Sequence, residues 1–228
     1  MKILALETAT IACSVALDTG REVLLRHQLA PREHAALLLP WVEELLGEAG
    51  FALNQLDAIA FGRGPGSFTS LRLGIGVVQG LAFGAGLGVV GISSLAALAQ
   101  SALARHQSNN FVVATDARMQ QVFSGCFKLD EAHKVRLTGT ESVCGPEDIP
   151  MPETGSWFGL GNGFSVYPQI LQDRMGERFG GYDADCWPQA DGIIHLAEAE
   201  VTRGKLLPPE QALPHYLRDK VATQKNTG

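Results

Sequence analysis

The chain has 228 residues, of which 46% are hydrophobic and 18% charged, as in a folded protein with a sizeable core rather than a disordered one. Its formal net charge is −6 without a cluster of Lys and Arg, which argues against a protein that binds nucleic acid by its own charge. The four cysteines stand far apart with no Cys-x-x-Cys pair, which argues against a zinc site and a disulfide framework.

The first half of the chain has the patterns of alternating strands and helices. Apolar runs end at turn residues such as Asp18-Thr19-Gly20, and apolar residues recur at helical spacing from Glu33 to Glu48, before a C-cap at Gly50. In chain order, we expect strands at 2–7, 12–17 and 22–29, a helix at 33–48, a strand at 58–61, a helix from about 69 to 83, a strand at 88–91 and a helix at 94–105.

The order of elements begins again near Asn109, which predicts an internal duplication. A strand that ends at Asp116 corresponds to the first strand, which ends at Glu7, and strands at 122–127 and from 135 follow it. Later elements are expected as a loop at 145–155, a strand and then a glycine turn within 157–163, and helices at 164–175 and 192–203. The prediction is an α/β protein of two halves, residues 1–108 rejoined by about 206–228, and residues 109–205.

A glycine-rich corner, Gly62 to Gly66, joins the strand at 58–61 to the next helix. Its glycines allow positive φ, Pro65 fixes one torsion, and Ser67 or Thr69 can cap the first helical amides. Such a corner can hold an anion or can simply turn a helix back across a sheet.

The apolar run from Leu71 to Ile92 is long enough to raise the question of a membrane span. Its glycines between Gly84 and Gly88 break the run, and Glu7 comes too early for a signal peptide. We therefore expect a cytoplasmic protein in which this run forms a buried helix and then a strand.

Four segments that run in order from the first residues to the last turn resemble the TsaB (YeaZ) family of bacteria. They are Leu4-Ala5-Leu6-Glu7-Thr8-Ala9-Thr10, Phe61-Gly62-Arg63-Gly64-Pro65-Gly66-Ser67-Phe68-Thr69, Thr115-Asp116-Ala117-Arg118-Met119 and Pro214-His215-Tyr216-Leu217-Arg218. The chain departs from the usual family pattern at Glu7, where Asp is commoner, at Ser70-Leu71 in place of Gly-Val, and at Thr223-Gln224 in place of Trp-Lys.

The resemblance implies a two-lobed fold of the actin/Hsp70/sugar-kinase type, with duplicated halves. It also implies a role in forming N6-threonylcarbamoyladenosine at position 37 of tRNAs that read codons starting with A. In the family, the homologue TsaD performs the transfer and holds the metal and the threonylcarbamoyl-adenylate. TsaB forms a heterodimer with TsaD, and the ATPase TsaE joins them; no catalytic role belongs to TsaB.

The two acidic strand ends, Glu7 and Asp116, raise the alternative of an ATP-dependent small-molecule kinase. Phosphotransferases of this fold hold Mg-nucleotide between such carboxylates, beside glycine turns. Here the following residues, Thr8 to Ile11 and Ala117 to Met119, contain no glycine. We interpret both carboxylates as vestigial candidates that cap turns or pair with a nearby Arg, and we expect no cofactor.

Metal binding and nucleophilic catalysis find little support. No two of the six histidines have the helical spacing of metal ligands, and His34 is interpreted as a surface or capping residue. The segment around Ser67 departs from the Gly-x-Ser-x-Gly of a nucleophile elbow, so we interpret Ser67 as a helix N-cap. Neither a metal ligand nor a catalytic residue is predicted.

Two helices favour a protein interface, and the first of them carries more apolar surface than one sheet face needs. On the first, the predicted contact residues are Leu37, Leu38, Trp41 and Leu45, with Trp41 as an anchor. On the second, Gly76, Gly80 and Gly84 recur every four residues, so that another element can approach the backbone; that element is either a partner or the protein's own sheet.

The sequence thus favours a non-catalytic scaffold subunit that heterodimerises with a TsaD-like catalytic subunit and enables a TsaE-like ATPase to bind. tRNA is expected to be bound only through the complex. The same apolar helices could also pair with a second copy of the chain, as in a self-associating regulator.

Overall fold

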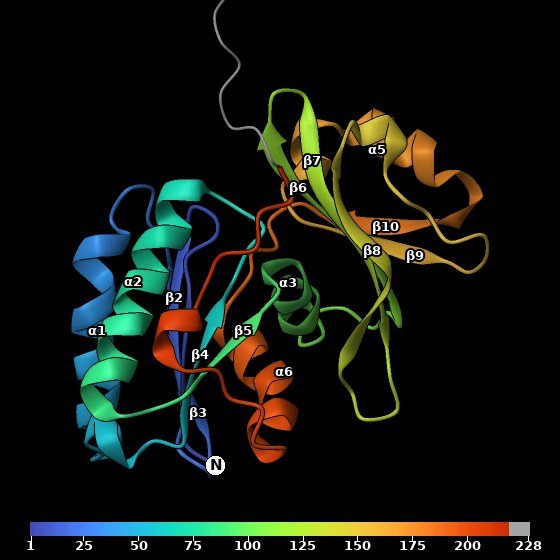
Figure 1. Cartoon of the computed structure of the whole chain (residues 1–228). Helices are drawn as coiled ribbons and strands as arrows, with labels where there is room; N and C mark the ends of the chain where they lie inside the picture. The colour runs from blue at the N-terminus through green and yellow to red at the C-terminus, as the bar shows by residue number, and fades with distance from the viewer. Residues whose placement is uncertain (219–228) are drawn as a thin grey trace, which may run out of the picture.

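A computed structural model describes residues 1–218, which fold into two β-sheets with helices packed on their faces (Figure 1). The first sheet has the strand order β3-β2-β1-β4-β5. Its strands are β1 (Ile3–Glu7), β2 (Ala12–Asp18), β3 (Val23–Leu29), β4 (Ala58–Gly62) and β5 (Val89–Ile92). β1 is antiparallel to β2 and parallel to β4, and its five residues are all buried, because helices cover both faces of the sheet.

The second sheet repeats this topology. Its order is β8-β7-β6-β9-β10, so each strand has the place of its counterpart in the first sheet. The strands are β6 (Asn110–Arg118), β7 (Gln121–Leu129), β8 (Val135–Cys144), β9 (Trp157–Leu160) and β10 (Phe179–Asp183). The predicted two-lobed α/β fold with duplicated halves is therefore confirmed.

The helices α1 (His34–Ala49) and α2 (Phe68–Ala85) lie side by side on the outer face of the first sheet (Figure 1). Their buried residues join the core cluster that includes Leu4, Val15 and Ile59 from the strands. Gly50 and Gly86 end the two helices in the left-handed conformation, with φ of 68° and 67°.

The last long helix of each half packs on the sheet of the other half. α3 (Ser94–Ala102) inserts Leu95 and Leu98 against Phe111 of the second sheet. In turn, α6 (Ala190–Thr202) packs Ile193 and Ile194 on the inner face of the first sheet. α6 thus covers the first sheet although the expected second lobe, residues 109–205, includes it, and these lobe bounds stay a prediction.

The smaller elements differ from expectation in three places. The helix expected at 164–175 is divided into α4 (Gly163–Val166) and α5 (Pro168–Met175), because Pro168 occupies the first turn of α5. The helix at 94–105 ends at Ala102. β10 was not anticipated, since Gly180 and Gly181 lie in its middle and weaken the strand pattern.

The glycine-rich corner positions α2 by close packing. A Cβ on Gly62 would overlap the carboxylate of Glu7, and a Cβ on Gly66 would overlap the backbone of Ala9. Ser67 is the N-cap residue, as predicted, but neither its side chain nor that of Thr69 accepts a hydrogen bond from a helical amide. The corner is thus a tight bend that brings the start of α2 next to the end of β1.

After α6 the chain returns along the first lobe as a C-terminal strap, residues 205–218. Leu207 pairs with Val89 of β5, and the His215 amide donates to the Arg63 carbonyl at 2.7 Å. The final described residue, Arg218, donates to the Ala117 carbonyl at 3.2 Å and to Gln121, so the strap ends on the second lobe. The expected departure at Thr223-Gln224 lies outside the described residues.

Candidate functional site

The outer face of α1 and α2 is the first candidate surface. α1 turns His34, Leu38, Val42 and Leu45 toward the core, and α2 does the same with Leu71, Gly74, Ile75, Val78 and Ala82. On the opposite side of the pair, Phe83 is 81% exposed and Leu39 is 47% exposed. Large apolar side chains therefore remain in contact with solvent on these two neighbouring helices.

The three glycines of α2 belong to this exposed face. A Cβ built on Gly76, Gly80 or Gly84 would have no heavy atom within 4 Å, apart from the helix's own nearby backbone. The protein's own sheet therefore does not explain these glycines, since it packs against the other side of α2. We call the exposed set Leu39, Gly76, Gly80, Phe83 and Gly84 the outer helix face.

The predicted contact residues of α1 fall into two groups. Leu38 and Leu45 are fully buried against the first sheet, so their prediction as surface contacts is wrong. Leu37 and Trp41 are half-buried, and they pack against the same core while retaining some accessible surface. Helical spacing alone did not separate these groups, because apolar residues surround much of α1.

α2 is long and apolar enough to cross a membrane by length and composition, and no other described helix is. In the fold it lies over the first sheet, and 28% of its 18 residues are buried. A Cβ on Gly74 would overlap the side chain of Thr8, the residue after β1, which shows how closely α2 packs on the chain at that point.

A groove of about 450 Å³ separates α2 from the C-terminal strap. Across it, the Gln79 side chain donates to the Ala212 carbonyl at 3.0 Å, and Arg72 Nε donates to the Tyr216 hydroxyl at 2.9 Å. Tyr216 also stacks on Phe68, with ring centroids 5.3 Å apart. The strap is thus fixed along one edge of α2.

Glu7 is sealed inside the first lobe. Its carboxylate accepts hydrogen bonds from the Ala9 amide at 2.6 Å and from the Ser94 hydroxyl at 2.8 Å. Desolvation by burial raises the pKa of Glu7 above its ordinary value of 4.5, against the opposing effect of these hydrogen bonds. This carboxylate caps a turn and does not line the cavity between the lobes.

Asp116 lies inside β6 and pairs with its neighbour Arg118. Asp116 Oδ2 is 3.2 Å from Arg118 Nη1, and Oδ1 accepts from the Arg118 amide at 2.9 Å. Asn162 Oδ1 accepts from the Asp116 amide at 3.0 Å. Both acidic strand ends therefore have hydrogen-bond partners within the chain: Glu7 bonds to Ala9 and to the distant Ser94, and Asp116 bonds to Arg118.

The side chains of His34, Cys13 and Cys126 are buried in the fold. His34 is buried, and its Nε2 lies 3.0 Å from the Thr10 carbonyl, so its interpretation as a surface residue is wrong. Desolvation raises the pKa of Cys13 to about 12 and that of Cys126 to about 11, which keeps both thiols protonated. Among residues 1–218, no three His, Cys, Asp or Glu side chains form a group that could hold a metal ion.

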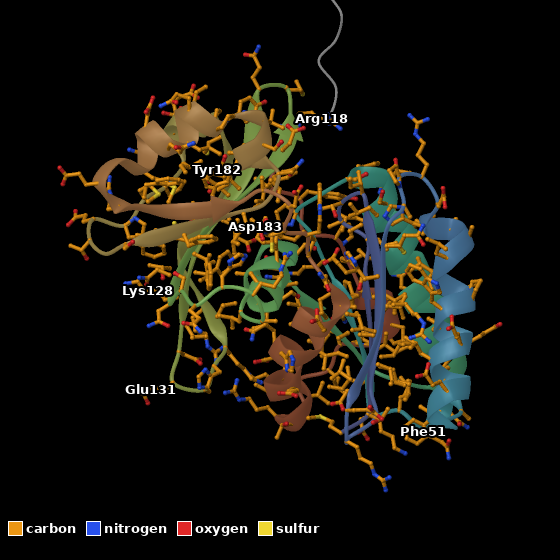
Figure 2. All side chains as sticks on the ribbon, turned by 180° about the vertical axis from the view of Figure 1, so that it is seen from behind. Phe51, Arg118, Lys128, Glu131, Tyr182 and Asp183 are labelled. Carbon is orange, nitrogen blue, oxygen red and sulfur yellow. The ribbon has the colours of Figure 1, made fainter. Side chains whose placement is uncertain are left out.

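A cavity of about 570 Å³ lies between the lobes, at the ends of β1 and β6. We call it the interlobe cleft. Its walls include the start of α2 and the end of the strap, together with arginines that sequence reasoning did not select: Arg32, Arg118 and Arg218. Figure 2 shows Arg118 at the end of the β6–β7 hairpin, next to the first lobe. No local motif connects these arginines, because they come from three distant segments.

The sequence and the fold of the chain are similar to those of one family of known proteins. The model for TsaD, tRNA N6-adenosine threonylcarbamoyltransferase, matches residues 27–155. The whole chain is 40% identical to the tRNA threonylcarbamoyladenosine biosynthesis protein TsaB of Haemophilus influenzae, covering 98% of it, and 38% identical to TsaB of Escherichia coli, covering 99%. The structure of YeaZ from Pseudomonas aeruginosa superposes with a TM-score of 0.88 at 45% identity, over 95% of this chain and 99% of that one. These findings confirm the predicted resemblance.

Proposed function

The chain belongs to the TsaB family of proteins that take part in tRNA threonylcarbamoyladenosine biosynthesis, and from that premise we propose that it is a non-catalytic subunit that heterodimerises with a TsaD-like homologue. The partner carries out the transfer to position 37 of tRNAs that read codons beginning with A. The composite surface of the two proteins receives a TsaE-like ATPase, and the complex works in the cytoplasm.

The outer helix face is the observation that carries this proposal. A glycine within a helix costs roughly 1 kcal/mol relative to alanine, and α2 contains three that touch nothing in their own chain. Close approach of another backbone offsets such a cost, whereas exposure to water does not. An exposed Phe83 beside them supplies the large apolar contact typical of an interface centre.

The extent of the TsaD match supports a TsaD-like protein as the partner. Residues 27–155 include both α1 and α2, so a TsaD-like protein contains a related helix pair. Two such pairs can pack as an intermolecular four-helix bundle, in which ridges of side chains fit into the groove along the glycines. A second copy of the chain offers the same helices, which makes the homodimer the competing assembly.

The placement of catalysis in the partner is supported by the two acidic strand ends. Glu7 is bonded to Ala9 and Ser94 inside the lobe, and Asp116 is paired with Arg118. A magnesium-nucleotide site of this fold would need both carboxylates free to face the cleft. Neither these bonds nor the relatives favour the alternative of a small-molecule kinase.

The test is co-purification of a TsaD-like partner with variants of the outer helix face. We expect Phe83→Asp to abolish the complex, because it places a charge at the centre of the apolar contact, while the isolated subunit keeps its melting temperature. Ile170→Asp is the matched control, since Ile170 is 42% exposed on α5 of the second lobe. A complex that survives Phe83→Asp as well as Ile170→Asp contradicts the proposed surface.

A further inference from the structure

The interlobe cleft has a local charge opposite to that of the chain. The protein carries a net charge of −6, yet Arg32, Arg118 and Arg218 all line this cavity, and Asp116 is the one acidic side chain among its described lining residues. Asp116 is paired with Arg118, so the charges of Arg32 and Arg218 have no acidic counterpart among the described lining residues. Such a cavity favours an anionic ligand.

Two of these arginines are held at the cleft from opposite lobes. Arg32 precedes α1 in the first lobe, and Arg118 is the last residue of β6 in the second. Both have left-handed backbones, with φ of 71° and 61°, a conformation that is unfavourable for a side chain of this size. Arg32 is exposed and has no ion pair or side-chain hydrogen bond within residues 1–218, and the Arg118 side chain is 85% exposed.

Arg218 has a different part in the cleft. Its guanidinium donates to the Ala117 carbonyl and to Gln121, so it fixes the turn that presents Arg118. Hydroxyl donors from Thr10, Ser67 and Ser70 line the same cavity. The first turn of α2 also lies there and contains no acidic residue, which leaves the positive end of the helix dipole uncompensated.

Aromatic rings at the edge of the cleft favour an RNA strand over a simple anion as the ligand. Phe68 and Tyr216 line the cavity, are each 38% exposed and stack with centroids 5.3 Å apart. Arg72 lies over the Phe68 ring at 3.8 Å from its centroid. Arginines beside exposed, stacked aromatics are the groups that bind the backbone and the unpaired bases of single-stranded RNA.

We propose that the interlobe cleft binds phosphates of an RNA strand, with Arg32 and Arg118 contacting the backbone from opposite lobes and Phe68 and Tyr216 offering a stacking surface. The choice of RNA over another phosphate compound rests on the proposed function in tRNA modification. Within the complex, this cleft adds a direct RNA contact to the one made by the partner.

The test uses the purified full chain and a labelled short RNA stem-loop, with binding followed by fluorescence anisotropy over a series of salt concentrations. We expect the double variant Arg32→Gln/Arg118→Gln to bind on the order of tenfold more weakly at low salt, and the slope of log affinity against log salt to fall by about 1.5, from two phosphate contacts at about 0.7–0.9 each. In an NMR titration of the unaltered chain, the shifted amides should surround Ser67 and Arg118.

Arg21→Gln is the matched control, because Arg21 is an exposed turn arginine near Met1, at the other end of the β1–β2 pair. Equal losses in the control and the double variant contradict the proposal, as does an unaltered chain that fails to bind the RNA even at the lowest salt. Mg-ATP that binds the cleft in place of RNA overturns the choice of ligand. Co-purification with the TsaD-like partner tests the proposed function separately. If the double variant still forms the complex, a loss of RNA binding concerns the interlobe cleft alone.

Discussion

At the scale of single residues, Glu7 shows how the fold can enclose a carboxylate that stands at the end of a strand. A carboxylate at the end of β1 is completely buried, and its oxygens bond to the Ala9 amide and the Ser94 hydroxyl. A Cβ on Gly62 would overlap it, so the chain leaves no space for another ligand there. The sequence located this group at a strand end, but its burial depended on α3, which brings Ser94 from far along the chain.

The buried Glu7 predicts a definite pH dependence of stability. Burial raises its pKa in the folded state above the ordinary value of 4.5, so the folded state holds the proton more tightly than the unfolded state. The contribution of Glu7 to stability is therefore greatest below pH 4.5 and falls as the pH rises toward the folded pKa, by at most about 1.4 kcal/mol per pH unit.

Glu7→Gln should remove this part of the dependence, as measured by urea unfolding across the pH range. Glu141, whose pKa burial also raises, stays in the variant and leaves a residual slope, so the difference between the two proteins is the quantity to compare. Identical pH profiles would show that Glu7 is ionised in the folded state with its ordinary pKa.

At the scale of elements, helical spacing predicted α1 and α2 well but not the direction of their faces. Apolar residues occupy so much of each circumference that Leu38 and Leu45 could not be told from Leu39 by spacing alone. The glycines of α2 carry the better signal, because they have no side chain to bury. Gly74, Gly76, Gly80 and Gly84 look alike in the sequence, yet Gly74 faces Thr8 and the other three face solvent.

Substitution of alanine at two of these glycines should therefore have opposite effects on the isolated chain. Gly80→Ala should stabilise it by about 0.5–1 kcal/mol, since alanine is the better helix former and its Cβ meets nothing within 4 Å. Gly74→Ala should destabilise it by about 1–3 kcal/mol, because its Cβ would overlap the side chain of Thr8, just after β1.

Chemical denaturation of both variants measures the change in the free energy of unfolding, and partner binding adds a second comparison. Gly80→Ala should weaken the TsaD-like complex while raising stability, which separates an interface effect from a folding effect. A stabilised Gly80→Ala protein that binds its partner with unchanged affinity would mean that the backbones do not approach closely at this turn of α2.

At the scale of the whole molecule, the duplication could be predicted from the order of elements, and the matching sheet orders confirm it. The packing of α3 on the second sheet and of α6 on the first could not be predicted from the sequence. Periodicity identifies an apolar face of a helix but does not indicate which sheet that face covers. The interlobe cleft was missed for a similar reason. Its arginines lie at positions 32, 118 and 218, and only folding brings these three segments together.

The two lobes are also connected by the end of the strap, and this connection can be tested at Arg218. Its guanidinium donates to the Ala117 carbonyl at 3.2 Å and to Gln121, on either side of a turn in which Arg118, Met119 and Gln120 all have positive φ. Such a turn needs support from its surroundings. Arg218→Ala removes that support and should cost about 1.5–3 kcal/mol, the usual contribution of hydrogen bonds to a charged group.

Hydrogen exchange of the β6–β7 amides reports where the loss occurs, and it should accelerate there more than in β1 or β4. Arg203→Ala is the control of equal charge, because Arg203 makes only an exposed ion pair with Glu200, three residues before it, which is worth within about 0.5 kcal/mol. If both variants lose the same stability and exchange uniformly, the strap does not hold the turn, and the position of Arg118 at the cleft is set by the β6–β7 hairpin itself.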